Sequence, residues 1–166
     1  VRELQGESCC VQETQPQPRK SMVVSRSFGQ VIRNPDELRD AFFWFAARAG
    51  EKLRLQKIKA GYIRFFLQQD PVHQRDVFQS WEEYVPGGVD STRELCRIGE
   101  KSLARLMIPE AGFRKGGILL ADLNTGRQRQ ISLFEDNGML MASRREKQLM
   151  HAIDFLNNKF GQDTVT

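Results

Sequence analysis

The segment Asn34–Gln68, NPDELRDAFFWFAARAGEKLRLQKIKAGYIRFFLQ, contains a helix pattern followed at once by a strand pattern. Asn34 is a good helix-capping residue and Pro35 suits the first helical position, so a helix is expected to begin here. Apolar residues then recur at spacings of three and four, which predicts a buried stripe along the helix. That stripe comprises Leu38, Phe42, Phe45, Ala49 and Leu53. From residue 60 to residue 68 apolar and polar residues instead alternate, which predicts a strand.

Further elements of both kinds flank this segment. Ser21–Gly29 is rich in β-branched and aromatic residues and predicts a preceding strand, while the apolar stretch Val77–Val85 predicts a following strand that ends at the PGG sequence. A capping box opens a second helix, Thr92–Met107, and the run 111–123 predicts a fourth strand. The order strand, helix, strand, strand, helix, strand is that of split β-α-β (ferredoxin-like) folds. We therefore predict an α+β domain in which one four-stranded antiparallel sheet has two helices on one face and leaves its other face open.

The two ends of the chain follow different patterns. The first twenty residues carry two prolines in ETQPQPRK and no periodicity, which is typical of a linker. After the fourth strand come a polar loop and a third helix, which is expected to begin with a capping box of Ser143 and Glu146 and to end at Gly161. No apolar run is long enough to span a bilayer and no secretory signal is present, so the sequence predicts a soluble, intracellular protein without a membrane partner.

Charge is distributed unevenly along the chain. The net charge is +4, but residues 70–94 contain six acids and two arginines, a local net charge of −4, so the remainder carries +8. Such an excess suits a face that binds a polyanion, and it also suits an ordinary solvated surface. The three cysteines, Cys9, Cys10 and Cys96, have neither disulfide nor zinc-site spacing, so no metal or other cofactor is expected in this chain.

The sequence carries no recognisable catalytic motif, because it lacks a nucleophile elbow, a phosphate-cradling glycine loop and paired catalytic carboxylates, and Cys96 is expected to be structural. What remains is a binding surface of basic, hydroxyl and amide side chains that can hydrogen-bond to phosphate oxygens. The candidates are Ser25, Arg26 and Ser27 on the first strand, Arg64 and Gln68 on the second, and Arg114 and Lys115 on the fourth. Binding of this kind would be independent of sequence and steeply dependent on salt. The alternative is that these are ordinary outward residues of a half-solvated sheet.

An RNA-recognition domain shares this topology and is a competing interpretation. Such a domain stacks bases on aromatic residues of its central strands. Where its signature would place them, the run RKGGILLA has Gly117 and Ile118 instead, so recognition by base stacking is disfavoured. A ferredoxin-like RNA-binding or regulatory module remains the alternative hypothesis.

Taken in order, SRSFG, NPDELRDAFFWFAARAGEKLR, FRKGGILLADL, QISLF and LMHAIDFLNNKFG resemble the C-terminal part of bacterial UmuC-type Y-family DNA polymerases, the type of the polymerase V catalytic subunit. The resemblance covers nearly the whole chain. It implies that residues 1–20 are the end of the thumb domain and a linker, that 21–124 form the DNA-binding little finger domain, and that 125–166 form a UmuC-specific tail. It also implies contact with the backbone of primer-template DNA by Ser25, Arg26 and Ser27, and by Arg64, Arg114 and Lys115.

The resemblance has further implications for activity and partners. The acidic palm residues that bind the catalytic Mg are not in this chain, so no polymerase activity is expected of it alone. The parent protein is expected to be an error-prone translesion polymerase of the SOS response, cytoplasmic and associated with the nucleoid. UmuD′ and RecA are implied as partners, but no residues in this chain locate their sites.

The pentapeptide QISLF, residues 130–134, is an apolar group within the polar run GRQRQISLFEDNG. It resembles the peptide Q-L-[SD]-L-F by which bacterial polymerases dock on the sliding clamp, and this likeness assigns Gln130, Ile131, Ser132, Leu133 and Phe134 to clamp binding. In such docking the glutamine amide fixes the register while the bulky apolar side chains fill a pocket of the partner. The alternative is that the apolar residues fold back onto their own domain.

Overall fold

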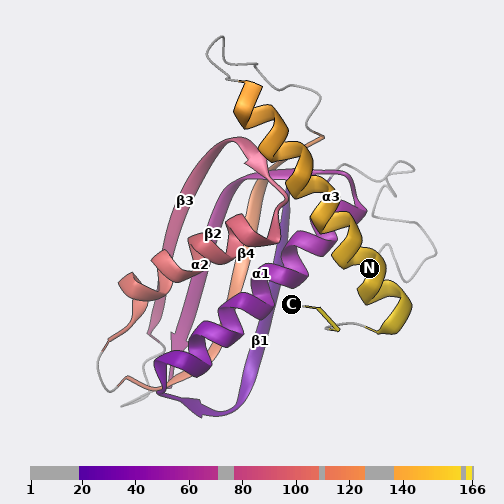
Figure 1. Ribbon diagram of the computed structural model, residues 1–166. Coiled ribbons are helices and arrows are strands. Elements are labelled where there is room, and N and C mark those ends of the chain that lie inside the picture. Colours follow the sequence, from indigo (N-terminus) through magenta and orange to yellow (C-terminus); the bar gives the residue numbers. More distant parts are fainter. Residues whose placement is uncertain (1–18, 71–76, 109–110, 126–136, 162–163, 166) are drawn as a thin grey trace, which may run out of the picture.

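In the computed structural model the described residues are 19–70, 77–108, 111–125, 137–161 and 164–165. In chain order, their elements are β1 (Ser21–Ile32), α1 (Pro35–Leu55), β2 (Lys59–Gln69), β3 (Phe78–Val89), α2 (Thr92–Leu106), β4 (Phe113–Asn124) and α3 (Asn137–Phe160), as Figure 1 shows. The predicted order of strands and helices is confirmed.

The strands form one antiparallel sheet in the order β1-β4-β2-β3, and α1 and α2 lie together on one face of it (Figure 1). The two β-α-β units are interlocked, because β4 lies between β1 and β2 while β2 lies between β4 and β3. The central strands are therefore β2 and β4. The predicted α+β fold, with two helices on one face of a four-stranded antiparallel sheet, is confirmed.

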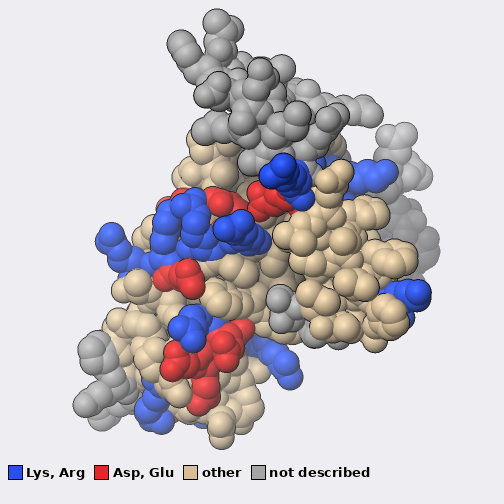
Figure 2. Space-filling model, viewed as in Figure 1, with Lys and Arg blue, Asp and Glu red and all other residues tan. Residues whose placement is uncertain are grey.

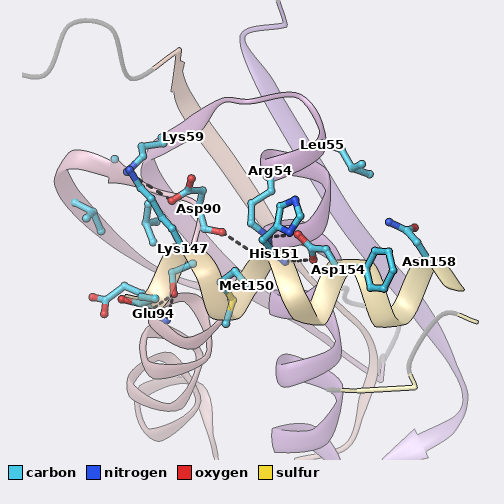
Figure 3. Close-up of a pocket in the computed structure, with 16 residues that line it drawn as sticks. Arg54, Leu55, Lys59, Asp90, Glu94, Lys147, Met150, His151, Asp154 and Asn158 are labelled. Carbon is cyan, nitrogen blue, oxygen red and sulfur yellow. Dashed lines mark hydrogen bonds and ion pairs between the residues drawn. The ribbon is translucent and has the colours of Figure 1, made fainter. Parts of the chain in front are cut away.

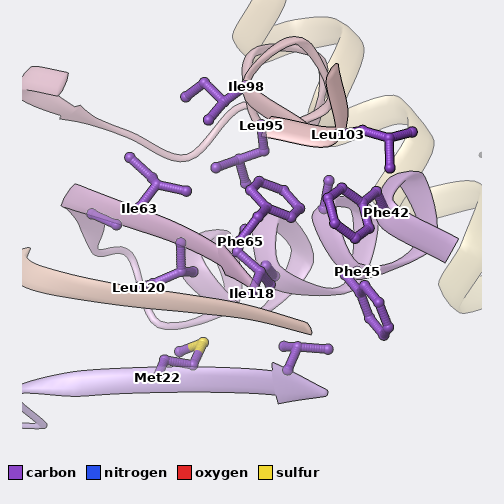
Figure 4. Close-up of a cluster of buried hydrophobic side chains, with 14 of the residues drawn as sticks. Met22, Phe42, Phe45, Ile63, Phe65, Leu95, Ile98, Leu103, Ile118 and Leu120 are labelled. Carbon is purple, nitrogen blue, oxygen red and sulfur yellow. The ribbon is translucent and has the colours of Figure 1, made fainter. Parts of the chain in front are cut away.

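An apolar layer fills the space between the helices and the sheet (Figure 4). The stripe predicted along α1 is buried in it, with Leu38, Phe42, Phe45, Ala49 and Leu53 each at most 1% exposed. From the sheet side, Phe65 of β2 stacks on Phe42 with 4.9 Å between the ring centroids. Removal of this apolar surface from water is the main stabilising contribution to the fold.

The strand β3 is longer than predicted, since it runs from Phe78 through the PGG sequence to Val89. Gly87 and Gly88 have φ angles of 81° and 72°, a left-handed conformation that glycine adopts readily. The pairing of β3 with β2 shifts its register at this point, so the glycines form an irregularity within the strand. The expectation that the strand ends before PGG is therefore wrong.

The helix α3 begins earlier than predicted, at Asn137, so Ser143 lies within it and cannot cap it. Glu146, the other half of the expected capping box, instead accepts a hydrogen bond from Oγ of Ser91 at 2.5 Å. The prediction failed because serine and glutamate are also tolerated inside helices, so the pattern alone does not mark a start.

Arg54 of α1 holds α3 against the rest of the fold (Figure 3). Its Nε and Nη2 atoms each donate to a carboxylate oxygen of Asp154 at 2.7 Å, and its Nη1 atom donates to the backbone oxygen of Asp90 at 2.8 Å. Beside this junction lies a hollow of about 580 Å³, in which Lys59 and Asp90 form another ion pair at 3.5 Å. Among the described side chains of α3, Met150 is the one that is fully buried. The position of α3 therefore depends largely on polar contacts.

Candidate nucleic-acid interface

The register of the sheet identifies the side chains that point away from the helices, because directly opposed residues of an antiparallel sheet share a face. Val24, Phe65 and Ile118 are buried against the helices, so their neighbours in sequence point outward. The outward positions form rows across the strands: Ser27, Lys115, Gln68 and Phe78; Ser25, Gly117, Phe66 and Ser80; Val23, Leu119, Arg64 and Glu82; and Ser21, Ala121, Tyr62 and Tyr84. These residues make up the outer face.

Four of the predicted DNA-contact residues lie together at one end of the outer face. Ser27, Lys115 and Gln68 are consecutive in one row, and Ser25 is in the next row. A hollow of about 380 Å³ opens beside them, with Ser27, Gln68 and Lys115 in its lining. Among the described residues, no side chain or backbone group forms a hydrogen bond or ion pair with these four side chains. Within the part of the chain that the structure describes, nothing occupies their donors.

Arg26 lies on the other side of the sheet from Ser25 and Ser27. It opposes Gly116, on the face that the helices cover, and its guanidinium carbon lies 5.9 Å from the centroid of the Trp44 ring of α1. Because β1 is an edge strand, this places Arg26 at the margin of the helix side. The structure therefore does not bring Arg26 together with the four residues of the outer face.

The other two predicted arginines are already paired with carboxylates. Arg64 lies on the outer face, where its Nη2 atom is 2.7 Å from Oε2 of Glu82 in the facing position of β3. The Nε atom of Arg114 forms an ion pair with Asp70 at the end of β2. Both arginines would have to exchange a carboxylate for a phosphate in order to bind DNA.

Glu82 is held from two sides. The hydroxyl of Tyr62 and the guanidinium of Arg64 both donate to its Oε2 atom. These hydrogen bonds, the one from Tyr62 foremost, lower the pKa of the Glu82 carboxyl below its usual value. Glu82 therefore stays ionised at neutral pH and neutralises Arg64.

Aromatic residues occupy the other half of the outer face, and those contributed by β3 were not recognised from the sequence. Phe66 stacks on Phe78 with 5.2 Å between centroids, and Tyr62 meets Tyr84 edge to face at 4.9 Å. Tyr84 is 71% exposed and Phe78 is 58% exposed. The run FQSWEEY indicates these positions, because residues an even number of positions apart in a strand point to the same face. Phe78 and Tyr84 are spaced in this way.

Gly117 is a glycine because the ring of Phe66 and the β1 backbone lie against it. A Cβ atom there would be 2.7 Å from the ring of Phe66, 2.6 Å from Cβ of Ser25 and 2.7 Å from the backbone oxygen of Val24. Glycine is therefore required at position 117 because neighbouring strands of the same sheet approach it closely. It leaves a smooth centre on the outer face between Ser25 and Phe66.

The helix side of the molecule differs from the outer face in its charges. Figure 2, which shows the side on which α1 and α2 lie in front of the sheet, has basic and acidic side chains intermingled. Many of them are paired, including Arg48 with Glu51 at 2.9 Å and Lys101 with Glu83 at 3.3 Å. Anion binding therefore depends more on cationic groups without a carboxylate partner than on the total number of basic residues. Lys115 is such a group as far as the described residues go.

Nothing in the described part of the chain resembles a catalytic centre. Cys96 is half-buried on α2, and burial, together with the nearby charge of Glu100, raises the pKa of its thiol to about 11, so it is a poor nucleophile at neutral pH. No group of three potential metal ligands is found among the described residues.

None of the helices described is long and apolar enough to cross a bilayer. The predicted clamp peptide, residues 130–134, lies outside the described residues.

Comparison with known proteins identifies related sequences along almost the whole chain. The impB/mucB/samB family C-terminal domain matches residues 19–133. The chain is 33% identical over 162 residues to the protein MucB of Salmonella typhimurium, which covers 96% of this chain and 37% of MucB. It is 30% identical over 167 residues to the protein UmuC of Salmonella typhimurium strain LT2, which covers 99% of this chain and 39% of UmuC. The chain thus spans less than two fifths of the length of these curated relatives.

Two solved structures of a DNA polymerase have a similar fold. The insertion ternary complex of Dbh DNA polymerase gives a TM-score of 0.51 at 13% identity, over 61% of this chain and 28% of that chain. The post-insertion binary complex of Dbh DNA polymerase gives a TM-score of 0.52 at 12% identity, over 62% of this chain and 28% of that chain. At these identities the likeness concerns the fold alone.

Proposed function

The chain belongs to the impB/mucB/samB family, and on this premise we propose that it is the DNA-gripping little finger region of an error-prone translesion DNA polymerase of the UmuC type. The longer protein would synthesise DNA past lesions as part of the SOS response. Its metal-dependent chemistry would belong to a palm domain elsewhere in the longer protein. The division into residues 1–20, 21–124 and 125–166 remains part of this proposal.

The observation that carries the DNA-binding proposal is the cluster of free polar groups on the outer face. Lys115 supplies a cation without a carboxylate partner among the described residues, and Ser25, Ser27 and Gln68 supply hydroxyl and amide donors around it. Phosphate oxygens are the natural ligands of such a set, whereas the edges of bases require a more specific pattern of donors and acceptors. We therefore propose contact with the backbone of primer-template DNA, without sequence preference.

The substitution Lys115→Gln tests this proposal. It is expected to weaken duplex binding about fivefold at low salt and to reduce the slope of log K against log salt concentration by about 0.9, because one phosphate contact is lost. Fluorescence anisotropy of a labelled duplex over a range of salt concentrations measures both quantities.

The matched control is Lys101→Gln, which removes the same charge from the helix side, where Lys101 pairs with Glu83 at 3.3 Å. It is expected to change duplex affinity less than twofold. Equal effects of the two substitutions would refute a DNA-binding role for the outer face. Tighter binding of single-stranded RNA than of duplex DNA would instead favour the RNA-binding alternative.

Docking on the bacterial sliding clamp is the second part of the proposed function. It rests on the sequence QISLF, in which Gln130 and the apolar anchors Leu133 and Phe134 stand within a polar run. By analogy with UmuC-type polymerases, UmuD′ and RecA are proposed as further partners of the longer protein. A polymerase that holds the duplex with its outer face and the clamp with a separate segment would bind a clamp loaded on DNA more tightly than it binds free DNA or the free clamp.

A further inference from the structure

Glu82 stands out on the outer face because it carries a negative charge where phosphate is proposed to bind. Within the outer face defined above it is the acidic residue, and the other charged residues of that face are Lys115 and Arg64. Its Oε2 atom accepts hydrogen bonds from Nη2 of Arg64 at 2.7 Å and from Nε of Arg64 at 3.1 Å. The site that Arg64 would offer to a phosphate is thus already filled by a carboxylate oxygen.

The pair differs from an ordinary surface ion pair in how firmly it is placed. Arg64 and Glu82 are direct cross-strand partners of β2 and β3, so the sheet itself fixes their separation. Tyr62 adds its hydroxyl to the same carboxylate oxygen, and its ring lies 5.4 Å from the guanidinium carbon of Arg64. The three side chains therefore hold one another in place, whereas most exposed pairs are loosely ordered.

The pair is still open to a competing ligand. The side chains of Arg64 and Glu82 are 39% and 49% exposed, so a phosphate could reach the guanidinium if the carboxylate were displaced. A guanidinium binds carboxylate and phosphate with the same fork of N–H donors, so the two anions compete for it directly.

We propose that Glu82 is a built-in competitor of phosphate that withholds Arg64 from DNA and thereby confines DNA binding to the end of the outer face that carries Ser25, Ser27, Gln68 and Lys115. This inference rests on the proposed DNA-binding function. Glu82 is then a specificity-determining residue: it limits the number of phosphates held, and it places the backbone along Ser25, Ser27 and Lys115. Around the pair of Arg64 and Glu82, the outer face presents aromatic residues and no net charge, so it offers no free cation to a phosphate.

The substitution Glu82→Gln tests the inference, since glutamine keeps the size of the side chain and removes its charge. The variant is expected to bind duplex DNA about three- to tenfold more tightly than wild type at low salt, with a salt slope steeper by about 0.9, because Arg64 gains a phosphate. Fluorescence anisotropy with the same duplex as for Lys115→Gln measures both quantities.

The chain offers a control in the adjacent residue. Glu83 belongs to the same strand, but it points to the helix side and pairs with Lys101 at 3.3 Å. Glu83→Gln therefore changes the net charge equally at nearly the same place, and it is expected to leave affinity within about twofold of wild type. Glu100→Gln on the exposed surface of α2 is a second control in case Glu83→Gln lowers stability, which a thermal unfolding curve would reveal.

A double variant shows whether the gain in duplex affinity of Glu82→Gln depends on Arg64. Arg64→Gln alone is expected to change affinity less than twofold, whereas Arg64→Gln in the Glu82→Gln background should remove the whole gain. Equal gains in Glu82→Gln and Glu83→Gln would overturn the inference in favour of a general charge effect. Wild-type affinity in Glu82→Gln, with Lys115→Gln still weakened, would overturn the inference and leave the proposed function standing. Absence of duplex binding in every variant would overturn both.

Discussion

Replacing Phe65 with alanine is expected to lower the free energy of unfolding by about 3–5 kcal/mol. Phe65 is fully buried on the central strand β2, and its ring stacks on Phe42 of α1 at 4.9 Å. It also lies beneath α2, since a Cβ added to Gly99 would be 3.2 Å from the ring. The substitution would therefore leave a cavity at the point where both helices meet the sheet, and neither helix can close it without losing its own contacts.

Urea denaturation followed by circular dichroism would measure this loss. Domains of this size are typically stable by about 5–15 kcal/mol, so the variant should unfold at a much lower urea concentration than wild type. Phe78→Ala is the matched control, because Phe78 belongs to the same sheet but points outward and is 58% exposed. Its loss is expected to be about 1 kcal/mol or less. Equal losses at the two positions would contradict the assignment of the buried face.

The fold could be predicted because its signals are local. The stripe of α1 and the alternation of β2 are set by residues a few positions apart, and Asn34 caps its helix by accepting a hydrogen bond from the backbone of Asp36 at 2.9 Å. The start of α3 was predicted wrongly because serine and glutamate are also tolerated inside helices. The position of α3 against α1 depends on Arg54 and Asp154, which are 100 residues apart, and no local pattern reports such a contact.

The candidate site could be predicted in part for the same reason. Side chains of a strand alternate between its two faces. Since Met22 and Val24 are buried on the helix side, Arg26 must point to the same side, away from Ser25 and Ser27. The separation of Arg26 from these serines could therefore have been predicted from the sequence. The pairing of Arg64 with Glu82 could not be predicted from the sequence. It depends on the register of β2 against β3, which the sequence of the loop between these strands does not specify.

Replacing Gln130, Leu133 and Phe134 together with alanine is expected to weaken binding to the bacterial sliding clamp by at least about a hundredfold. The reason is that a docking peptide of this kind takes most of its binding energy from a few anchors, and each large apolar anchor contributes about 2 kcal/mol or more. Isothermal titration calorimetry of the chain into the clamp would measure the loss directly. Wild-type binding is expected in the micromolar range.

Ser132→Ala is the matched control, because it alters the same pentapeptide at the position where the docking motif tolerates different side chains. It is expected to change clamp affinity less than threefold. Lys115→Gln should leave clamp binding unchanged while it weakens duplex binding, since the outer face and residues 130–134 are separate in the chain. If the triple variant bound the clamp as tightly as wild type, or if neither bound it, QISLF would not be a docking peptide. The proposal for the outer face would then stand on its DNA affinity alone.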